Sequence, residues 1–552
     1  MTTKQFTVER FLGIDRTPSA SPGSFEKAEG VSLDSYPAVT LGASWQNEPL
    51  GEGLLLQLFE NPYSDKPIFV SDDYGSKSLN IYVGDTLYTV QISNKLQKAG
   101  KYFYDLQAGM VYWMDTAVSA IKTKSLSESV TMSSTVRLKN EVAGQVQIVA
   151  YNLGKKAYFE IGDRLHLSCD DWSDNLEHVD AECFADREES AHDTDDYALT
   201  YTVENAVVAQ ASSGYTHTYT CTVTGCGGGL FESPYTQVEF GGSYAPLTVG
   251  LWFPSGITDM CVHNNRIACV TQKGDSIRLT SLGSYNCFYD FSGEETDSFF
   301  TDVETDGPFV ACVSFAGTLV CFKRNTIHVL YGSTPSEYTL AKTIKGFGCI
   351  DAESVIESGG RLMFLTEHGY AIYNGACAYL KNVFGKEIQS AKAVTDGIRI
   401  YTLQTYTDQT RELAVYDTRY GVWTTHALHD SCIDICFHGA FCQGLVNSNC
   451  RRLSEGSGGF SLETCKMYEG GFGKKHQIEL RLRISADNPF ILVSTQTEDG
   501  WHQYTDRITM SGLYEKEYEV RAKPTDWYAW KMEATRGSTN LLAWKVSTAI
   551  SF

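Results

Sequence analysis

The sequence predicts an all-β protein, namely a multi-blade β-propeller with an inserted small β domain and a C-terminal β-sandwich. Tyr, Phe and Gly are abundant, with 32, 27 and 48 copies among 552 residues, and long helical stripes are few. From residue 256 onward, apolar strands and tight turns recur about every 40 to 50 residues. Near the C-terminus, apolar and polar residues alternate with the period of two that a strand requires.

The chain divides into five expected parts. Hairpin-like strands begin after residue 50, an acid-rich interval separates two strand-like segments further on, and a Gly-rich linker at 456–473 precedes perfect alternation at 477–484. These observations predict an N-terminal arm (1–50), the first propeller strands (51–155), the inserted small β domain (156–225), the remaining blades (226–455) and the C-terminal β-sandwich (470–552).

Four copies of a blade-like unit follow one another after residue 256. Each has short apolar strands joined by tight turns, the pattern of a small antiparallel sheet that buries its faces only by stacking on neighbours. The expected turns include Asn264-Asn265, Gly359-Gly360 and Asp396-Gly397. The expected strands are 260–262, 267–270 and 277–279, then 309–315, 318–322 and 327–331, then 354–356, 361–365 and 370–373, then 393–394, 398–403, 413–417 and 420–423. A row of unrelated hairpins is the alternative.

Charge excludes several classes of function. Lys plus Arg total 45 against 67 Asp plus Glu, and the net charge of −22 argues against binding nucleic acid or an anionic membrane. Neither a signal peptide nor a run of about 18 apolar residues is present, so we expect no secretion signal and no membrane insertion. Most of the 16 cysteines lie within apolar alternation, which predicts buried thiols made in a reducing cytoplasm.

The segment 170–196 supplies half of the net charge, with twelve carboxylates and one Arg. One interpretation is a cation-binding or DNA-repelling surface facing a lumen, and the other is a solvated loop. The carboxylates of this candidate acidic patch are Asp170, Asp171, Asp174, Glu177, Asp180, Glu182, Asp186, Glu188, Glu189, Asp193, Asp195 and Asp196.

Three candidate metal or disulfide sites are weak. Cys432 and Cys436, near His429, His438 and Cys442, suggest zinc on paper, but on one strand their thiols lie roughly 13 Å apart, so core packing is favoured. The segment 302–307 resembles the start of a calcium loop, but its twelfth position is Val313 rather than a carboxylate. Cys221 and Cys226 flank a turn, and a reducing cytoplasm argues against their disulfide.

Enzyme signatures are absent from the sequence. It has no Gly-x-Ser-x-Gly elbow, His-Glu-x-x-His helix or phosphate-binding Gly-Lys-Ser/Thr loop, so we expect no catalytic residues, no cofactor and no metal. A propeller glycosidase, with two carboxylates at the central channel, is a further alternative. Trp423, Trp501 and Trp527 either line a sugar-binding groove or pack within sheets.

Two stretches resemble a family of tailed-bacteriophage structural proteins, common in phages of Gram-positive gut bacteria. The first is Phe11-Leu12-Gly13-Ile14-Asp15-Arg16-Thr17-Pro18 with Asp34-Ser35-Tyr36-Pro37-Ala38-Val39, although Thr40-Leu41-Gly42 replaces the family's basic turn. The second runs over 259–423 and ends in Val415-Tyr416-Asp417-Thr418-Arg419-Tyr420-Gly421-Val422-Trp423. The tail from Trp527 to Val546 looks like the family's terminal β-sandwich.

The resemblance implies a structural component of a phage virion. Its expected role is a ring-forming tail nozzle or hub, or a head-to-tail connector, that guides or retains the genome. Expected partners are further copies in a homo-oligomeric ring, with a hexamer favoured, other tail or connector proteins, and DNA that passes without specific binding. The protein would assemble in the bacterial cytoplasm and reside in the virion. The candidate inter-subunit arm contains Phe11, Gly13, Asp15, Arg16, Tyr36 and Pro37. A receptor- or glycan-binding protein at the tail tip is the alternative.

Overall fold

The computed structural model describes most of the chain and divides it into two compact units. Unit 1 comprises Met1–Ile92 and Cys349–Phe552, and unit 2 comprises Ser93–Gly348. The described residues are 2–551 without 18–19, 22–23, 42–43, 49, 51–53, 127–128, 133–135, 143–144, 154–158, 160–163, 170–199, 225–235, 241–246, 252, 255, 273–275, 289–293, 304–306, 427, 429–431, 439–440, 447–448, 455–458, 469–473, 488–489, 508–511 and 536–537.

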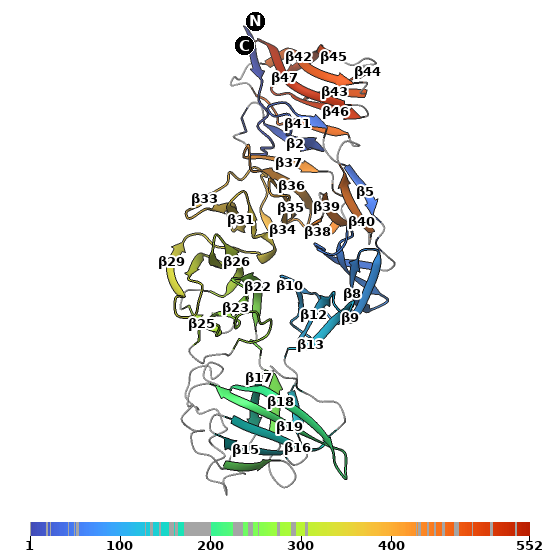
Figure 1. The fold of residues 1–552 in the computed structure, drawn as a ribbon. Helices are drawn as coiled ribbons and strands as arrows, with labels where there is room; N and C mark the ends of the chain where they lie inside the picture. The colour runs from blue at the N-terminus through green and yellow to red at the C-terminus, as the bar shows by residue number, and fades with distance from the viewer. Residues whose placement is uncertain are drawn as a thin grey trace. The chain divides into compact units, whose positions relative to one another are not determined.

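Unit 1 contains four described blade sheets, each with four antiparallel strands (Figure 1). They are β6–β9 (Leu54–Phe59, Ile68–Asp73, Ser76–Val83, Thr86–Ile92), β30–β33 (Ile356–Ser358, Arg361–Thr366, Gly369–Tyr373, Cys377–Tyr379), β34–β37 (Ile388–Thr395, Arg399–Tyr406, Arg411–Asp417, Val422–His426) and β38–β39–β40–β5 (Cys432–His438, Phe441–Val446, Asn449–Ser454, Ser44–Glu48). Contacts between their first strands stack these sheets in the order β30, β34, β38, β6. Strand β5 comes from the N-terminal arm and pairs with β40, so this blade combines residues about 400 positions apart in the sequence.

Unit 2 contains three described blade sheets of the same kind. They are β10–β13 (Gln97–Ala99, Tyr102–Asp105, Met110–Asp115, Ala120–Ser125), β22–β25 (Ile257–His263, Arg266–Thr271, Ser276–Leu279, Phe299–Asp302) and β26–β29 (Phe309–Phe315, Thr318–Lys323, Thr326–Tyr331, Thr339–Lys345). Strand β22 contacts both β10 and β26, which places the blades in sequence order. Repeated four-stranded meanders that stack on consecutive neighbours are the architecture of a β-propeller, so the predicted fold class is confirmed.

The inserted β domain is larger than predicted. Its eight-stranded sheet has the order β14-β21-β17-β18-β19-β16-β15-β20. The strands are Ser129–Met132 (β14), Val136–Val142 (β15), Gln145–Leu153 (β16), Arg164–Cys169 (β17), Thr200–Gln210 (β18), Tyr215–Thr224 (β19), Thr236–Phe240 (β20) and Leu247–Leu251 (β21). The sheet therefore spans 129–251 rather than 156–225. Strands β15 and β16 alternate like blade strands, and their pairing with β20 and β19 assigns them to the insert.

The C-terminal β-sandwich draws strands from both ends of the chain. One sheet has the order β1-β47-β42-β45, and the other contains β2-β41-β46-β43-β44 and continues through β2 into blade β34–β37. The strands are Thr2–Val8 (β1), Phe25–Glu29 (β2), Phe460–Thr464 (β41), Lys474–Asp487 (β42), Phe490–Thr497 (β43), Gly500–Arg507 (β44), Gly512–Thr525 (β45), Ala529–Thr535 (β46) and Ser538–Ser551 (β47), and two short strands, Val31–Ser32 (β3) and Thr40–Leu41 (β4), pair nearby. The expected linker at 456–473 contains β41, and β1 pairing with β47 brings the termini together (Figure 1).

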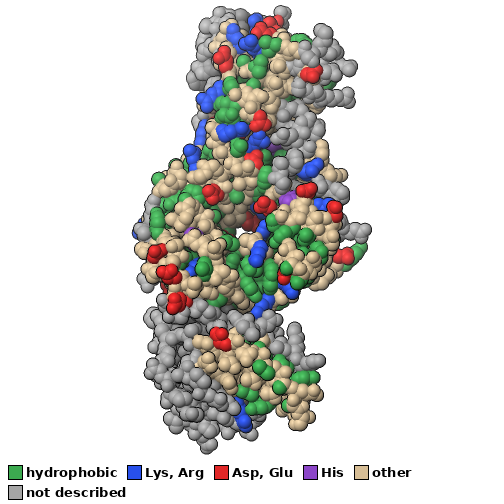
Figure 2. All heavy atoms as spheres, viewed as in Figure 1, with side chains coloured by type: hydrophobic (Ala, Val, Ile, Leu, Met, Phe, Trp, Pro, Cys, Tyr) green, Lys and Arg blue, Asp and Glu red, His purple; other side chains and the backbone are tan. Residues whose placement is uncertain are grey.

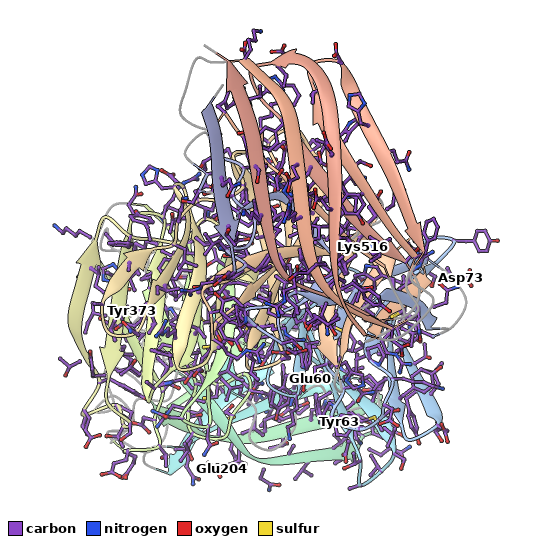
Figure 3. The ribbon with its side chains drawn as sticks, turned by 90° about the horizontal axis from the view of Figure 1, so that it is seen from above. Glu60, Tyr63, Asp73, Glu204, Tyr373 and Lys516 are labelled. Atoms are coloured by element: carbon purple, nitrogen blue, oxygen red, sulfur yellow. The ribbon has the colours of Figure 1, made fainter. Side chains whose placement is uncertain are left out.

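Apolar and aromatic side chains fill the sandwich, and charged side chains lie on its surface. Phe25 packs edge-on against Trp530 and Trp544, with ring centroids 5.7 and 6.3 Å apart. Because aromatic pairs of this geometry add about 0.5 to 1.5 kcal/mol to their area burial, Phe25 is a strong anchor for the arm. Figure 3 shows the long sandwich strands, with Lys516 on β45. On the sandwich at the top of Figure 2, Lys and Arg side chains intersperse with Asp and Glu.

The predicted hairpin turns follow from their residue types. Asn264 and Asn265 have φ of 47° and 58°, and Gly359 and Gly360 have 58° and 71°. Two successive positive φ values are those of the tight turn that matches strand twist, and Asn and Gly adopt them most readily.

Among the described residues, no helix has the length and apolar composition to cross a bilayer.

Candidate functional site

The N-terminal arm docks on the last strand of blade β34–β37 through its backbone. Ile14 donates to the carbonyl of Trp423 at 2.9 Å, and Phe25 donates to the carbonyl of Gly13 at 2.9 Å. Gly13 has φ +80°, and a Cβ there would lie 2.6 Å from the Trp423 oxygen and 2.6 Å from Val422 Cγ1. The approach of the two backbones therefore requires glycine.

An ion pair joins the arm to the middle of the same blade. The Arg16 guanidinium donates two parallel hydrogen bonds to the Glu412 carboxylate, at 2.9 and 2.7 Å, and the Tyr406 hydroxyl donates to the same carboxylate at 2.5 Å. Burial alone would raise the pKa of Glu412, but hydrogen bonds from Arg16 and Tyr406 outweigh burial and hold it below its usual value. This bidentate pair is sheltered and geometrically specific.

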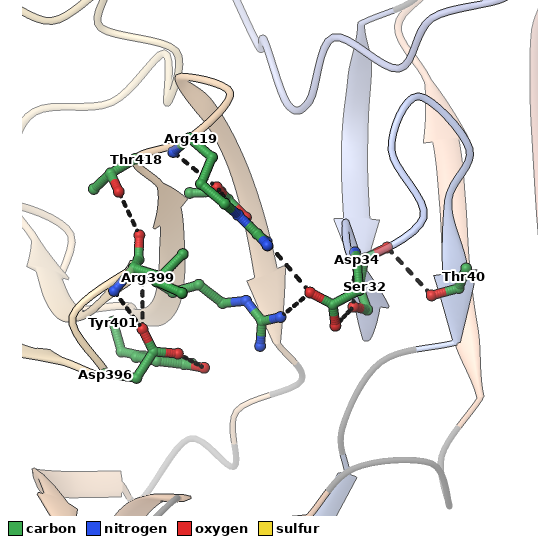
Figure 4. Close-up of polar contacts among 10 residues, drawn as sticks. Ser32, Asp34, Thr40, Asp396, Arg399, Tyr401, Thr418 and Arg419 are labelled. Atoms are coloured by element: carbon green, nitrogen blue, oxygen red, sulfur yellow. Dashed lines mark hydrogen bonds and ion pairs between the residues drawn. The ribbon is translucent and has the colours of Figure 1, made fainter. Parts of the chain in front are cut away.

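Two aspartates extend the docking along the arm. Asp34 accepts hydrogen bonds from Arg399 and, at 3.3 Å, from Arg419 (Figure 4). Asp15 accepts from Lys381. Burial would raise the pKa of both carboxyls, but these donors and local hydroxyls outweigh it and lower both.

Aromatic stacking completes the docking. The Tyr36 ring stacks on Tyr420, with centroids 4.1 Å apart and planes at 14°, and the peptide bond to Pro37 is cis. Phe11 is 4% exposed and packs on Phe25. The N-terminal stretch and the stretch that ends at Trp423 therefore contact each other, although about 400 residues separate them.

The candidate inter-subunit residues thus hold the N-terminal arm on blade β34–β37 of the same chain. Phe11, Gly13 and Asp15 are buried, and Arg16 and Tyr36 are half-buried. Their contact with a neighbouring subunit stays a prediction. The candidate acidic patch at 170–196 lies outside the described residues.

An aspartate in unit 2 links three consecutive blades. Asp259, at a β-bulge in β22, accepts from the Gln97 amide of β10 at 2.8 Å and from the Cys312 backbone N–H of β26 at 2.9 Å. A bulge leaves the ladder locally unpaired, and Cys312 directly follows the bulge at Phe309/Ala311. The carboxylate therefore satisfies a backbone donor that the next blade exposes.

Unit 1 repeats this arrangement with a cation. Asp434, at a bulge in β38, accepts from the Lys392 ammonium of β34 and, at 2.7 Å, from the Leu58 backbone N–H of β6. Asp434 is 6% exposed. Burial would lower the pKa of Lys392, but Asp434 outweighs it and raises that pKa. We call the Asp259 and Asp434 arrangements aspartate clamps.

Each clamp belongs to a short repeat that the sequence analysis missed. Asp259-Met260-Cys261-Val262-His263 and Asp434-Ile435-Cys436-Phe437-His438 share Asp, Cys and His at alternate positions. Alternate residues of a strand point to one face, so all three side chains face the next blade. His263 Nδ1 lies 2.9 Å from Ser314 Oγ, and His438 Nδ1 accepts from the Asn61 N–H at 3.2 Å. An internal comparison for Asp-x-Cys-x-His would have found the clamps.

A polar pocket of about 470 Å³ lies beside the docked arm. Its walls come from β2, from the Tyr406 end of blade β34–β37 and from β41. The lining residues are Arg16, Glu26, Lys27, Glu29, Lys386, Tyr406, Thr410, Arg411, Glu412, Thr425, His426, Leu428 and Glu463. Acidic and basic groups are balanced and mostly paired, as in Arg16 with Glu412, so the lining suits a polar ligand better than a single ion.

Two groups of this pocket have perturbed protonation. Burial, and then the nearby Arg399, lowers the pKa of His426 to about 4, so its imidazole is neutral near pH 7. Burial, and then Glu26, raises the pKa of Glu463. Such shifts also arise in structural networks, and the arm-docking contacts account for this lining.

Several of the other candidate residues pack in the core. Cys432 and Cys436 are buried with relative exposures of 0% and 4%, and the Trp423 indole packs against Tyr370 and Phe384. Cys221 is buried, and burial raises its pKa to about 12. Within the part of the chain that the structure describes, no group of three His, Cys, Asp or Glu could hold a metal ion. His429 and Cys226 lie outside that part.

Comparisons with known proteins bear on the fold alone. No protein-family model and no curated protein matches the chain. Similar solved structures include a chain of a mitotic checkpoint complex (7% identity, TM-score 0.31, 75% of this chain and 93% of that one) and Chaetomium thermophilum Raptor (8%, 0.37, 75% and 29%). An exo-β-1,3-galactanase from Phanerochaete chrysosporium is also similar (10%, 0.22, 54% and 96%). These values carry no argument about activity.

Proposed function

We propose that the chain is a non-enzymatic structural component of a phage virion. Its copies form a ring in the tail nozzle or hub, or in the head-to-tail connector, and this ring guides or retains the genome. The observation that carries the proposal is the mutual docking of the two family-like stretches, in which Ile14 bonds Trp423 and Tyr36 stacks on Tyr420. In this proposal the motifs are structural parts rather than catalytic ones.

The mechanical role is supported by how the blades and the arm are joined. The aspartate clamps each tie three consecutive blades, and the arm contributes strands to the sandwich and to one blade. A part that bears load during genome passage gains from such long-range ties, because separating its sheets then requires several buried polar contacts to break together. The phage assignment itself rests on the resemblance.

Charge supports a conduit that DNA does not adhere to. The chain carries a net charge of −22, and each basic group on a channel wall would bind phosphate and slow passage. The carboxylates at 170–196 would repel DNA if they face a lumen. We expect no retardation of duplex DNA by the purified protein at low salt, and tight binding would contradict the conduit role.

Assembly state is the direct test of the ring. Native mass spectrometry and negative-stain electron microscopy of the purified full chain should show a closed ring of about six copies with an axial opening. A matched preparation of Gly13→Ala, which releases the arm, tests whether arm docking is needed for the ring. A stable trimer would contradict the ring and favour a tail-tip protein.

A receptor- or glycan-binding role is the second candidate, and one exposed residue favours it. Trp501 is 44% exposed on the edge strand β44 of the sandwich, where an indole can stack on a sugar ring. Host cell-wall glycan is added stepwise to the protein while its tryptophan fluorescence is measured, with Trp501→Ala as the matched variant. A fluorescence change that the variant loses would support this role. No change in fluorescence, or an equal change in the variant, would contradict it.

A further inference from the structure

The blade junction in unit 2 brings three thiols together. Cys261 on β22 packs against a buried cluster that contains Cys312 on β26 and Cys321 on β27. Cys312 pairs directly with Cys321, and its Sγ lies 3.9 Å from the carbonyl oxygen of Ala268, the residue that pairs with Cys261. The clamp fixes this approach, because Asp259, two residues before Cys261, holds the Cys312 N–H.

Cys261 and Cys312 pack in one cluster across the junction. A hydrogen bond with Cys261, and then burial, raises the pKa of Cys312. Cys312 is 4% exposed, whereas Cys261 is half-buried and reaches solvent. Cys261 is therefore the more exposed residue of the pair and Cys312 the buried one, which is the order expected of an attacking and a resolving cysteine.

We propose that Cys261 and Cys312 form a reversible disulfide that staples blade β22–β25 to blade β26–β29 when the protein meets a low-molecular-weight disulfide such as oxidised glutathione. The Cys261 thiolate attacks one glutathione sulfur and releases the other glutathione as a thiol. Cys312 then loses its proton, attacks Cys261 Sγ and releases the second glutathione. Two protein thiols are oxidised, and one glutathione disulfide is reduced to two thiols.

The staple adds to the proposed function and does not depend on it. A protein made in a reducing cytoplasm keeps these thiols free, and transfer to an oxidising medium closes the bond. The other Asp-x-Cys-x-His repeat provides a matched control. There the backbone donor equivalent to Cys312 belongs to Leu58, which has no thiol, so the Cys261–Cys312 pair has no counterpart at that position.

Peptide mapping of the oxidised protein tests the staple. The fully reduced full chain is incubated with oxidised glutathione, alkylated and digested, and the expected product is a peptide pair that joins Cys261 to Cys312. Cys436 should remain alkylated. The melting temperature should rise by roughly 5 °C and return after dithiothreitol treatment.

Variants separate this bond from its competitors. Cys261→Ser, at a half-buried position, should fold normally and lose both the linked peptide and the rise in melting temperature, while Cys321→Ala should keep both. Recovery of Cys261 only as its glutathione adduct, a Cys312–Cys321 linkage, or no linkage would overturn the proposal. Cys312→Ala removes the buried partner and should likewise lose the linked peptide and the rise in melting temperature.

Discussion

The two aspartate clamps hold three blades by the same geometry but with different chemistry. In unit 2, the Asp259 carboxylate accepts hydrogen bonds from the neutral side-chain amide of Gln97 and from the backbone N–H of Cys312. In unit 1, the Asp434 carboxylate accepts hydrogen bonds from the ammonium of Lys392 and from the backbone N–H of Leu58. The bulged first strand and the exposed donor of the next blade are common to both.

The difference shows which part of the clamp the fold requires. The carboxylate and the bulge recur, because the next blade presents a buried N–H that needs an acceptor. The donor from the preceding blade varies between an amide and a cation. Its identity changes the energetics, since removal of the carboxylate leaves a largely buried cation without its hydrogen-bonded partner only in unit 1.

The largest expected effect is that of Asp434→Ala. This substitution leaves the Lys392 ammonium without its hydrogen-bonded partner and the Leu58 N–H without an acceptor. We therefore expect the free energy of unfolding of unit 1 to fall by about 3 to 5 kcal/mol. Urea denaturation, with hydrogen exchange of peptides from β38 and β6, measures the change. An effect no larger than that of the corresponding change in unit 2 would remove the distinction between the clamps.

Acid should weaken the junction beside the arm by a comparable amount. The folded-state pKa of His426 is about 4 and its ordinary value is 6.5, so between these values the unfolded chain binds the extra proton and stability falls as pH falls. The loss should reach about 3 kcal/mol at 1.4 kcal/mol per pKa unit.

His426→Phe keeps a ring on Tyr401 and removes the titration. The variant should therefore lose less stability than the native chain between pH 6.5 and 4, as measured by urea denaturation at each pH. His328 in unit 2, also with a pKa of about 4 through burial and then Lys323, should keep its own acid response in this variant. An unchanged pH profile would show that His426 is not the titrating group.

Asp259→Ala should lower the free energy of unfolding by less than Asp434→Ala does, namely by about 1 to 3 kcal/mol. It leaves the Gln97 amide and the Cys312 N–H without this acceptor, but both are neutral groups. Hydrogen exchange of peptides from β22 and β26 should increase, while β38 peptides stay unchanged. A cost equal to that of Asp434→Ala would mean that the charge of Lys392 contributes little to the difference.

The sequence predicted local elements well and long-range ones poorly. The strand expected at 309–315 is β26 itself, because an apolar run between turn residues is a local signal. The arm strands β2 and β5 were not predicted, since their partners β41 and β40 lie about 400 residues away. Strands β15 and β16 were expected in the propeller, because only pairing partners distinguish them from blade strands.

In the candidate site, too, the sequence predicted local features but not the partners that lie far away in the chain. The first family-like stretch was recognised as an arm, but its partners Glu412 and Arg399 carry no local sign of that role. The clamp aspartates form a readable repeat with Cys261 and Cys436. Their function, however, depends on bulges such as those in β22 and β38, and a bulge is a property of paired strands.

The smallest expected effect comes from converting one clamp into the other. Lys392→Gln would give Asp434 an amide donor like that of Asp259, at an expected cost of about 1 to 2 kcal/mol near pH 7. Burial already raises the pKa of Asp434, and loss of the cation should raise it further. The folded variant then binds more protons than the unfolded chain, so its stability relative to native should improve as pH falls from 7 toward 5. Urea denaturation of both proteins at each pH measures this difference, and a cost that grows on acidification would show that the two clamps are not interchangeable.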